Sequence, residues 1–113
     1  MATDTLGEFE QLVLLAILHV RRRDEAGVYG VSIMDEIERR TGRSVSRPAV
    51  YVTLRRLERK GLLSSWMGEA RPERGGKARR CVAITPTGEA LLTECRAVMD
   101  RMWGDLAPAR DRT

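Results

Sequence analysis

Glycine and proline divide this chain of 113 residues into short segments, and their spacing limits the folds open to it. Gly42 and Gly61 each follow an amphipathic stretch, which is where glycine commonly ends a helix. Pro48 and Pro86 come shortly after Ser or Thr, as proline does in a first helical turn. Each segment has room for one helix or one short hairpin. The chain is therefore predicted to form one small domain of short elements.

The spacing of apolar residues predicts four helices. In four segments apolar side chains recur at every third or fourth position and so line one face of a helix. The predicted helices are residues 6–20, 29–40, 46–60 and 86–107. The first is apolar around most of its circumference, so it needs cover on more than one side, part of which a second subunit could supply. In the second, Ile33 and Ile37 mark the inner face, and Glu36 is expected on the outer face.

Between the third and fourth helices the pattern becomes that of a β-hairpin. Residues 62–67 and 79–85 are predicted strands, and residues 68–77 hold Pro72, Gly75 and Gly76, as a turn requires. Two helices joined by a short turn and followed by a hairpin describe a winged helix-turn-helix. The predicted fold class is mainly α with a small β-hairpin. Its parts are a winged helix-turn-helix DNA-binding domain (residues 1–85), a C-terminal dimerisation helix (86–107) and a frayed tail (108–113).

The charge is unevenly distributed along the chain. Residues 43–80 contain eleven Lys and Arg against three Glu, a net charge of +8, whereas the remainder carries −4 and the whole chain +4. A basic segment on an otherwise acidic chain is typical of a surface that binds a polyanion. A solvated face is the alternative interpretation. The third helix and the predicted hairpin tip both lie within this segment.

The third helix is predicted to enter DNA, because the major groove admits one helix and displays a different pattern of donors and acceptors for each base pair. The N-terminal half of this helix and the basic loop would supply the contacts. The predicted DNA-binding residues are Tyr29, Ser46, Arg47, Pro48, Tyr51, Val52, Arg55, Arg74, Lys77 and Arg79. Tyr29 and Tyr51 could instead pack against the core, and each arginine could form a surface ion pair.

The first and last helices are predicted to form a homodimer seam. Apolar residues of the last helix step by three and four over two heptads, which is the pattern of a helix that packs on another helix. The predicted interface residues are Phe9, Leu12, Leu15, Leu92, Cys95, Met99, Met102, Trp103 and Leu106. An intrachain contact is the alternative. Met99 and Trp103 could also line a cleft for a small-molecule effector at this seam.

The residues argue against an enzyme. His19 is the sole histidine and lies on an apolar helix, which leaves no evident base for a Ser or Cys nucleophile. The loop around Gly75 and Gly76 lacks the Ser or Thr of a nucleotide-phosphate loop. Cys81 and Cys95 could form a thiol sensor or a metal site with His19, but the spacing is not that of metal ligands. No cofactor and no metal are predicted.

Several short motifs together resemble a known family. They are Leu6-Gly7-Glu8-Phe9-Glu10, Tyr29-Gly30-Val31, Ser46 through Ala49-Val50-Tyr51, Leu57-Glu58-Arg59-Lys60-Gly61-Leu62, Arg74-Gly75-Gly76-Lys77 and Thr85-Pro86-Thr87-Gly88. In this order and at this spacing they are similar to the PadR family of bacterial transcriptional regulators, over residues 6 to about 107.

The resemblance implies a homodimer built through its first and last helices, which binds a roughly palindromic operator as a repressor. Two departures matter. A single C-terminal helix leaves no effector pocket made from a longer C-terminal domain, and Cys81 occupies a strand position that is usually aromatic in the family.

Location and rival functions follow from what the chain lacks. No apolar run approaches the roughly 18 residues of a membrane helix. Acidic residues near the N-terminus argue against a signal peptide, and two cysteines are too few for a secreted disulfide framework. We therefore expect a cytoplasmic protein whose partners are double-stranded DNA and a second copy of itself, with no membrane. The alternatives are a winged-helix protein-interaction module and a thiol- or metal-responsive sensor.

Overall fold

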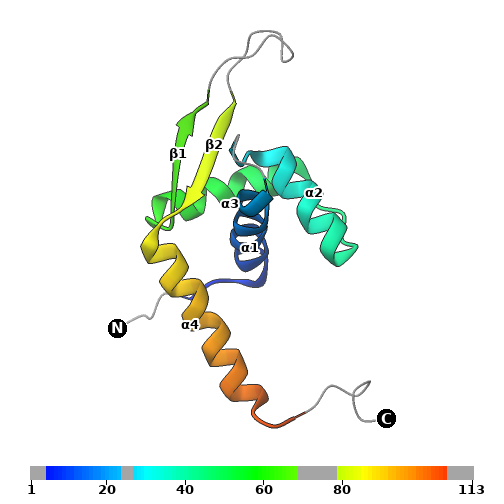
Figure 1. Cartoon of the computed structure of the whole chain (residues 1–113), viewed down its shortest axis with the longest axis vertical. Helices are drawn as coiled ribbons and strands as arrows, with labels where there is room; N and C mark the ends of the chain where they lie inside the picture. The colour runs from blue at the N-terminus through cyan, green and yellow to red at the C-terminus, as the bar shows by residue number, and fades with distance from the viewer. Residues whose placement is uncertain (1–4, 24–26, 69–78, 107–113) are drawn as a thin grey trace.

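The computed structural model describes residues 5–23, 27–68 and 79–106, and it confirms the predicted fold class (Figure 1). The described chain is mainly helical with one two-stranded antiparallel hairpin. Its elements are α1 (Glu8–Arg23), α2 (Gly30–Thr41), α3 (Arg47–Arg59), β1 (Leu63–Met67), β2 (Arg80–Ile84) and α4 (Pro86–Trp103). Among the described residues, no helix is both long and apolar enough to cross a bilayer.

The expected capping residues set the ends of the helices. The Oγ atom of Ser46 accepts a hydrogen bond from the Ala49 N–H at 3.2 Å and so caps α3. Thr85 caps α4 in the same way. Gly42 and Gly61 follow α2 and α3 with φ of +74° and +77°, a backbone conformation that glycine adopts without steric cost. The short helices therefore end where the sequence requires.

Helix α1 forms the centre of the domain. The side chains of Val13, Leu14 and Ile17 are fully buried, and α2, α3 and β2 all pack against this helix. Figure 1 shows α1 with α2 beside it, α3 behind it and the hairpin above. Leu15 is the large apolar side chain of α1 that stays exposed, at 41%. Most of the cover that α1 needs thus comes from its own chain.

Helix α1 is longer at its C-terminal end than predicted, and the added turn brings an arginine to Glu36. The helix continues three residues beyond Val20, and its last turn carries Arg21, Arg22 and Arg23. Arginine at a helix C-terminus is stabilised by the helix dipole. Arg23 also reaches Glu36 on α2, with 2.5 Å between Nη2 and Oε1.

The predicted outer position of Glu36 is wrong. Its side chain is fully buried, and the guanidinium groups of Arg23, Arg39 and Arg40 surround it. Each of these arginines is about half exposed, so the three side chains seal the carboxylate while they stay partly in water. Sequence periodicity could not anticipate this, because a buried charge is tolerated only where several partners converge on it.

The hairpin and α4 meet at the end of α3. Strand β1 pairs with β2 in the register Leu63 with Ile84 and Met67 with Arg80, and Val28 adds a single bridge to Val82. Gly88 in the first turn of α4 packs against the Leu62 carbonyl, where a Cβ atom would clash. This close approach fixes the direction in which α4 leaves the domain.

Only the first half of α4 packs on its own chain. Gly88 and Leu92 are its buried residues, and the helix then runs away from the domain (Figure 1). Five large apolar side chains near its end are exposed by 43–75%: Val98, Met99, Met102, Trp103 and Leu106. The single chain therefore leaves an apolar helix end uncovered.

The carboxylate of Glu36 should make the free energy of unfolding depend on pH in the acidic range. Burial alone would raise its pKa, but hydrogen bonds from Arg23, Arg39 and Arg40 outweigh burial and hold the pKa at about 2, below its ordinary value of 4.5. Its stabilisation is therefore complete above pH 4.5 and is lost as the pH falls towards 2. We expect Glu36→Gln to lower the free energy of unfolding by about 2 kcal/mol at neutral pH in urea titrations.

Glu38→Gln, on an exposed position of the same helix, is the matched control. It should leave the free energy of unfolding nearly unchanged. Equal losses of stability between pH 5 and pH 3 in the wild type and in Glu36→Gln would contradict the assignment.

Candidate nucleic-acid interface

Helix α3 presents one face to the core and another to solvent. Val50, Thr53, Leu54 and Leu57 are buried beneath it. The exposed face carries Arg47, Pro48, Val52, Arg55 and Arg59. Arg55 forms no hydrogen bond or ion pair with another described residue, so its guanidinium is available to a ligand. Three arginines beside a proline and a valine form a surface that suits phosphate and base edges better than plain solvent.

The start of α3 is also suited to an anion. The first turn of a helix has backbone N–H groups without intrahelical partners and the positive end of the helix dipole. Ser46 is exposed here, and its hydroxyl oxygen is already used as the cap of α3. Arg47 follows it directly and is exposed. This turn joins a positive side chain to free backbone donors.

Tyr51 does not stand on the fully exposed face. It is half-buried and packs against the edge of the core. Its ring lies over Gly30 at the start of α2, so closely that a Cβ atom there would be 2.5 Å from the phenolic Oη. Both interpretations of Tyr51 therefore retain support: the ring packs at the junction of α2 and α3, and its edge lines a surface pocket next to Arg55.

Tyr29 and Arg79, two predicted DNA contacts, are engaged with each other. The Arg79 guanidinium carbon lies 4.0 Å from the centre of the Tyr29 ring, a cation–π contact. The Tyr29 N–H donates to Ser32 Oγ at 3.1 Å, and that hydroxyl donates back to the Tyr29 carbonyl at 2.7 Å. The pair thus joins the tip end of the paired strands, just before β2, to the start of α2.

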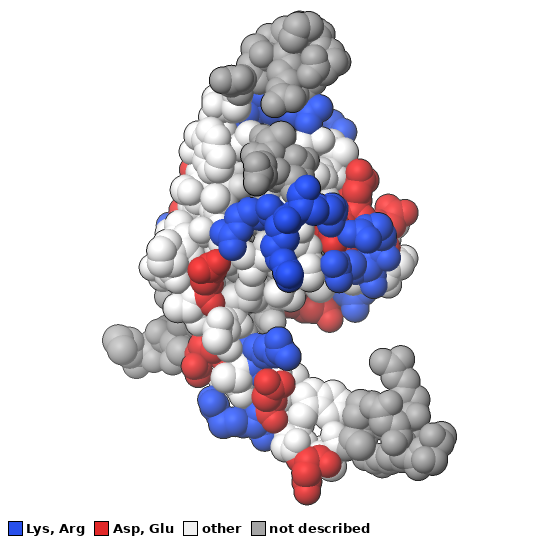
Figure 2. Space-filling model, viewed as in Figure 1, with Lys and Arg blue, Asp and Glu red and all other residues white. Residues whose placement is uncertain are grey.

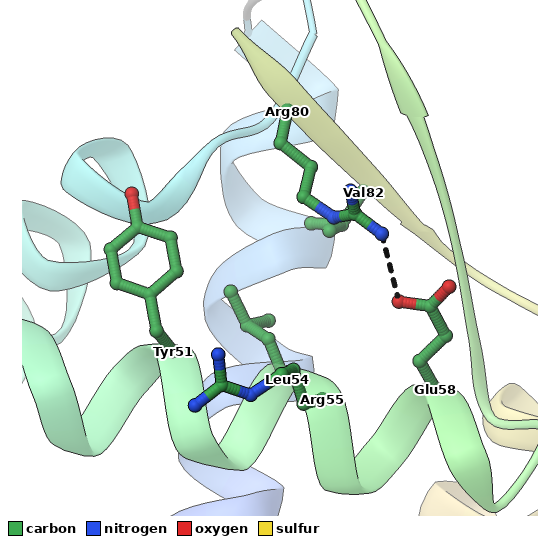
Figure 3. Close-up of a pocket in the computed structure, with 6 residues that line it drawn as sticks. All are labelled: Tyr51, Leu54, Arg55, Glu58, Arg80 and Val82. Atoms are coloured by element: carbon green, nitrogen blue, oxygen red, sulfur yellow. Dashed lines mark ion pairs between the residues drawn. The ribbon is translucent and has the colours of Figure 1, made fainter.

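A pocket of about 310 Å³ opens between α3 and β2 (Figure 3). Its lining residues are Tyr51, Leu54, Arg55, Glu58, Arg80 and Val82. Figure 3 shows Arg80 reaching from β2 towards Glu58 on α3. Arg80 belongs to the basic segment that was expected to lie along the DNA backbone. The alternation of β2 places it on the same strand face as Val82, which is buried.

Two further observations concern charge. The predicted contacts Arg74 and Lys77 lie outside the described residues. Figure 2 shows Lys and Arg side chains gathered over the face where α1 and α2 lie, so the positive surface is not confined to residues 43–80. Arg21, Arg22, Arg23, Arg39 and Arg40 are the exposed arginines of these two helices. Three of them share the negative charge of Glu36, which leaves that cluster net positive.

The candidate sensor residues are separate in the fold. Cys81 is buried in β2, and its Sγ lies close to Gly27 and Gly68, while Cys95 is half-buried in α4. Within residues 5–23, 27–68 and 79–106, no three His, Cys, Asp or Glu side chains gather as metal ligands would. Cys81 fills the strand position with a small side chain that contacts two glycines.

The fold and the basic face of α3 define a winged-helix transcriptional regulator that binds DNA. Residues 17–94 match the family described as "Transcriptional regulator PadR-like family". Transcriptional regulator Rv3488 of Mycobacterium tuberculosis is 37% identical over 107 residues, which are 94% of each chain. The chain belongs to the PadR family, whose members are transcriptional regulators rather than enzymes.

Solved structures agree with this assignment. A PadR-like transcription factor from Bacteroides fragilis matches with a TM-score of 0.68 and 23% identity, over 85% of this chain and 84% of that one. A PadR family regulator from Eggerthella lenta matches with a TM-score of 0.63 and 26% identity, over 84% and 79% of the two chains. Both resemble this chain over its helix-turn-helix fold.

The contact between Gly30 and Tyr51 can be tested by a double-mutant cycle. A methyl group at Gly30 would collide with the Tyr51 ring, so Gly30→Ala should lower the free energy of unfolding by about 1–3 kcal/mol. In a Tyr51→Ala background the same change should cost much less, because the colliding ring is gone. Equal costs in both backgrounds, measured by urea unfolding, would contradict the placement of Tyr51.

Proposed function

We propose that this regulator is a homodimeric, sequence-specific repressor that acts on a palindromic operator in the bacterial cytoplasm. The proposal rests on one observation: the basic exposed face of α3 and the uncovered apolar end of α4 belong to the same small domain. The first surface suits DNA and the second suits a copy of the same helix. Together they meet the two requirements of a regulator with two half-sites.

The bases would be read by α3 and the phosphates bound around it. The Arg55 guanidinium has no hydrogen bond or ion pair with a described residue, and it lies about two turns along α3 on the exposed face, where a bidentate guanine contact can form. Val52 beside it can contact a thymine methyl, and Arg47 and Ser46 suit a phosphate at the helix start. Pro48 and Tyr51 border this surface. Contacts from Tyr29, Arg79 and the hairpin tip with Arg74 and Lys77 complete the proposed interface.

The dimer would form at the end of α4, where the apolar side chains are exposed. Met99, Met102, Trp103 and Leu106 line a shallow apolar surface at the end of this helix. Burial of each such side chain contributes roughly 1.5–3 kcal/mol of favourable free energy. Phe9, Leu12 and Leu15 on α1, with Cys95 on α4, would extend the seam. Leu92 is already buried within the chain, so it would contribute little.

A twofold axis through this seam would present two copies of α3 to successive major grooves, which is the geometry that a palindromic operator requires. The same seam offers Met99 and Trp103 to an apolar effector, as methionine and aromatic side chains commonly do. Occupation of the operator would exclude polymerase and so repress transcription.

Replacement of Arg55 tests the base-reading role. We expect Arg55→Ala to weaken binding to the selected operator by about 1–3 kcal/mol and to relax the preference at one base pair. The measurement is selection of bound sequences from random duplexes, followed by fluorescence anisotropy on the selected site. Arg96→Ala, an exposed arginine of α4, is the charge-matched control. An equal loss on operator and random duplexes would show that Arg55 contacts phosphate only.

The α4 seam is tested by sedimentation equilibrium. The wild type should be a dimer at micromolar concentration, and Met102→Glu should be a monomer, because a carboxylate would be buried in an apolar contact. Met67→Glu changes another exposed methionine, on the hairpin, and should remain dimeric. A wild type that is monomeric, or a Met102→Glu variant that still dimerises, would refute the seam.

A further inference from the structure

One side of α3 turns towards the hairpin rather than towards open solvent. Residues three and four apart lie above one another on a helix, so Tyr51, Arg55 and Glu58 form a row. Arg80 faces this row from β2, and all four residues line the pocket of about 310 Å³ (Figure 3). Two arginines and one carboxylate thus share the border between the two elements that the proposed function brings to DNA.

The contacts of Arg80 are loose. Its Nη2 donates to Ser65 Oγ at 3.0 Å and lies 3.8 Å from Glu58 Oε1. Ser65 in turn donates to Glu58 Oε2 at 2.9 Å. The side chains of Arg80 and Glu58 are 59% and 39% exposed, and exposed pairs of this kind contribute little to stability. An exchange of partner therefore costs Arg80 little.

The position of Glu58 needs an explanation other than helix stability. It lies in the last turn of α3, where the dipole disfavours a carboxylate. It is also the one acidic residue of α3, on a helix with four arginines. Near the duplex this carboxylate would repel phosphate. Its location beside Arg80 indicates that it acts on that arginine.

We propose that in the free protein Glu58 pairs with Arg80, and that Arg80 exchanges this carboxylate for a backbone phosphate of the duplex when the regulator binds DNA. This inference rests on the proposed function. The free protein then carries one cation fewer on its DNA-facing surface, so it binds random duplexes more weakly. Glu58 limits affinity, and Arg80 is a phosphate contact that the exposed face of α3 does not include.

If the exchange occurs, removing the Glu58 carboxylate should strengthen DNA binding. If the ion pair only stabilises the fold, its removal should not strengthen binding. Glu58→Gln should tighten binding to operator and random duplexes alike by about threefold and make the salt slope steeper. Arg80→Gln should weaken both by about threefold and make the slope shallower. The two changes in slope should together amount to about one, because Arg80 makes a single phosphate contact. In an Arg80→Gln background, Glu58→Gln should bring a much smaller gain, because Arg80 is no longer there to be released and only the repulsion between the carboxylate and phosphate is relieved.

The cycle is measured by fluorescence anisotropy with a selected operator and a random duplex over a series of KCl concentrations. Glu89→Gln removes an exposed carboxylate from α4 and controls for net charge; it should leave affinity nearly unchanged. Thermal unfolding by circular dichroism confirms that each variant is folded. Weaker binding by Glu58→Gln, or an equal gain with and without Arg80, overturns the proposal.

Failure of this inference is distinguishable from failure of the proposed function. If the wild type binds duplexes in a salt-dependent manner and Arg47→Ala weakens that binding while the Glu58 and Arg80 cycle stays flat, the exchange alone is refuted. If no duplex is retained at low salt by the wild type, the proposed function is refuted and the exchange with it.

Discussion

The burial of α1 is the interaction on which the rest of the structure depends. The side chains of Val13, Leu14 and Ile17 are fully buried, and α2, α3, β2 and the start of α4 are each placed by contact with the same helix. The relative position of the α3 surface and the hairpin follows from this arrangement. An ion pair also joins the two helices: Lys60 Nζ, just beyond the end of α3, donates to Glu10 Oε2 of α1 at 3.0 Å.

The elements of the candidate interface are joined by side-chain contacts at their edges. Arg79 over Tyr29 connects the hairpin to α2, Ser65 and Arg80 connect it to Glu58, and the Tyr51 ring sits against Gly30. These contacts lie at the partly exposed rim of the core, where side chains can change partner at small cost. The same rim contains Tyr29, Tyr51 and Arg79 of the candidate interface.

Local rules of the sequence predicted the elements but not their mutual contacts. Ser46, Thr85, Gly42 and Gly61 determine helix ends through their own backbone and hydroxyl groups, and such effects can be read without a structure. The positions of Glu36, Tyr51 and Arg80 depend on side chains from other elements. Periodicity therefore assigned Glu36 to the wrong face, and it could not reveal that Tyr29 and Arg79 meet.

The attachment of α4 has a mechanical consequence. Thr85 caps this helix, its N–H donates to the Leu62 carbonyl at 3.0 Å, and its hydroxyl donates to Gly61 at 2.8 Å. Helix α4 is thus joined tightly to the corner where α3 ends, so it can tilt only together with that corner. Its 18 residues span about 27 Å, so a tilt of roughly 10° at that corner moves the far tip by about 5 Å. A displacement of this tip is therefore coupled to Gly61 and Leu62, the two residues that follow α3 and its cap.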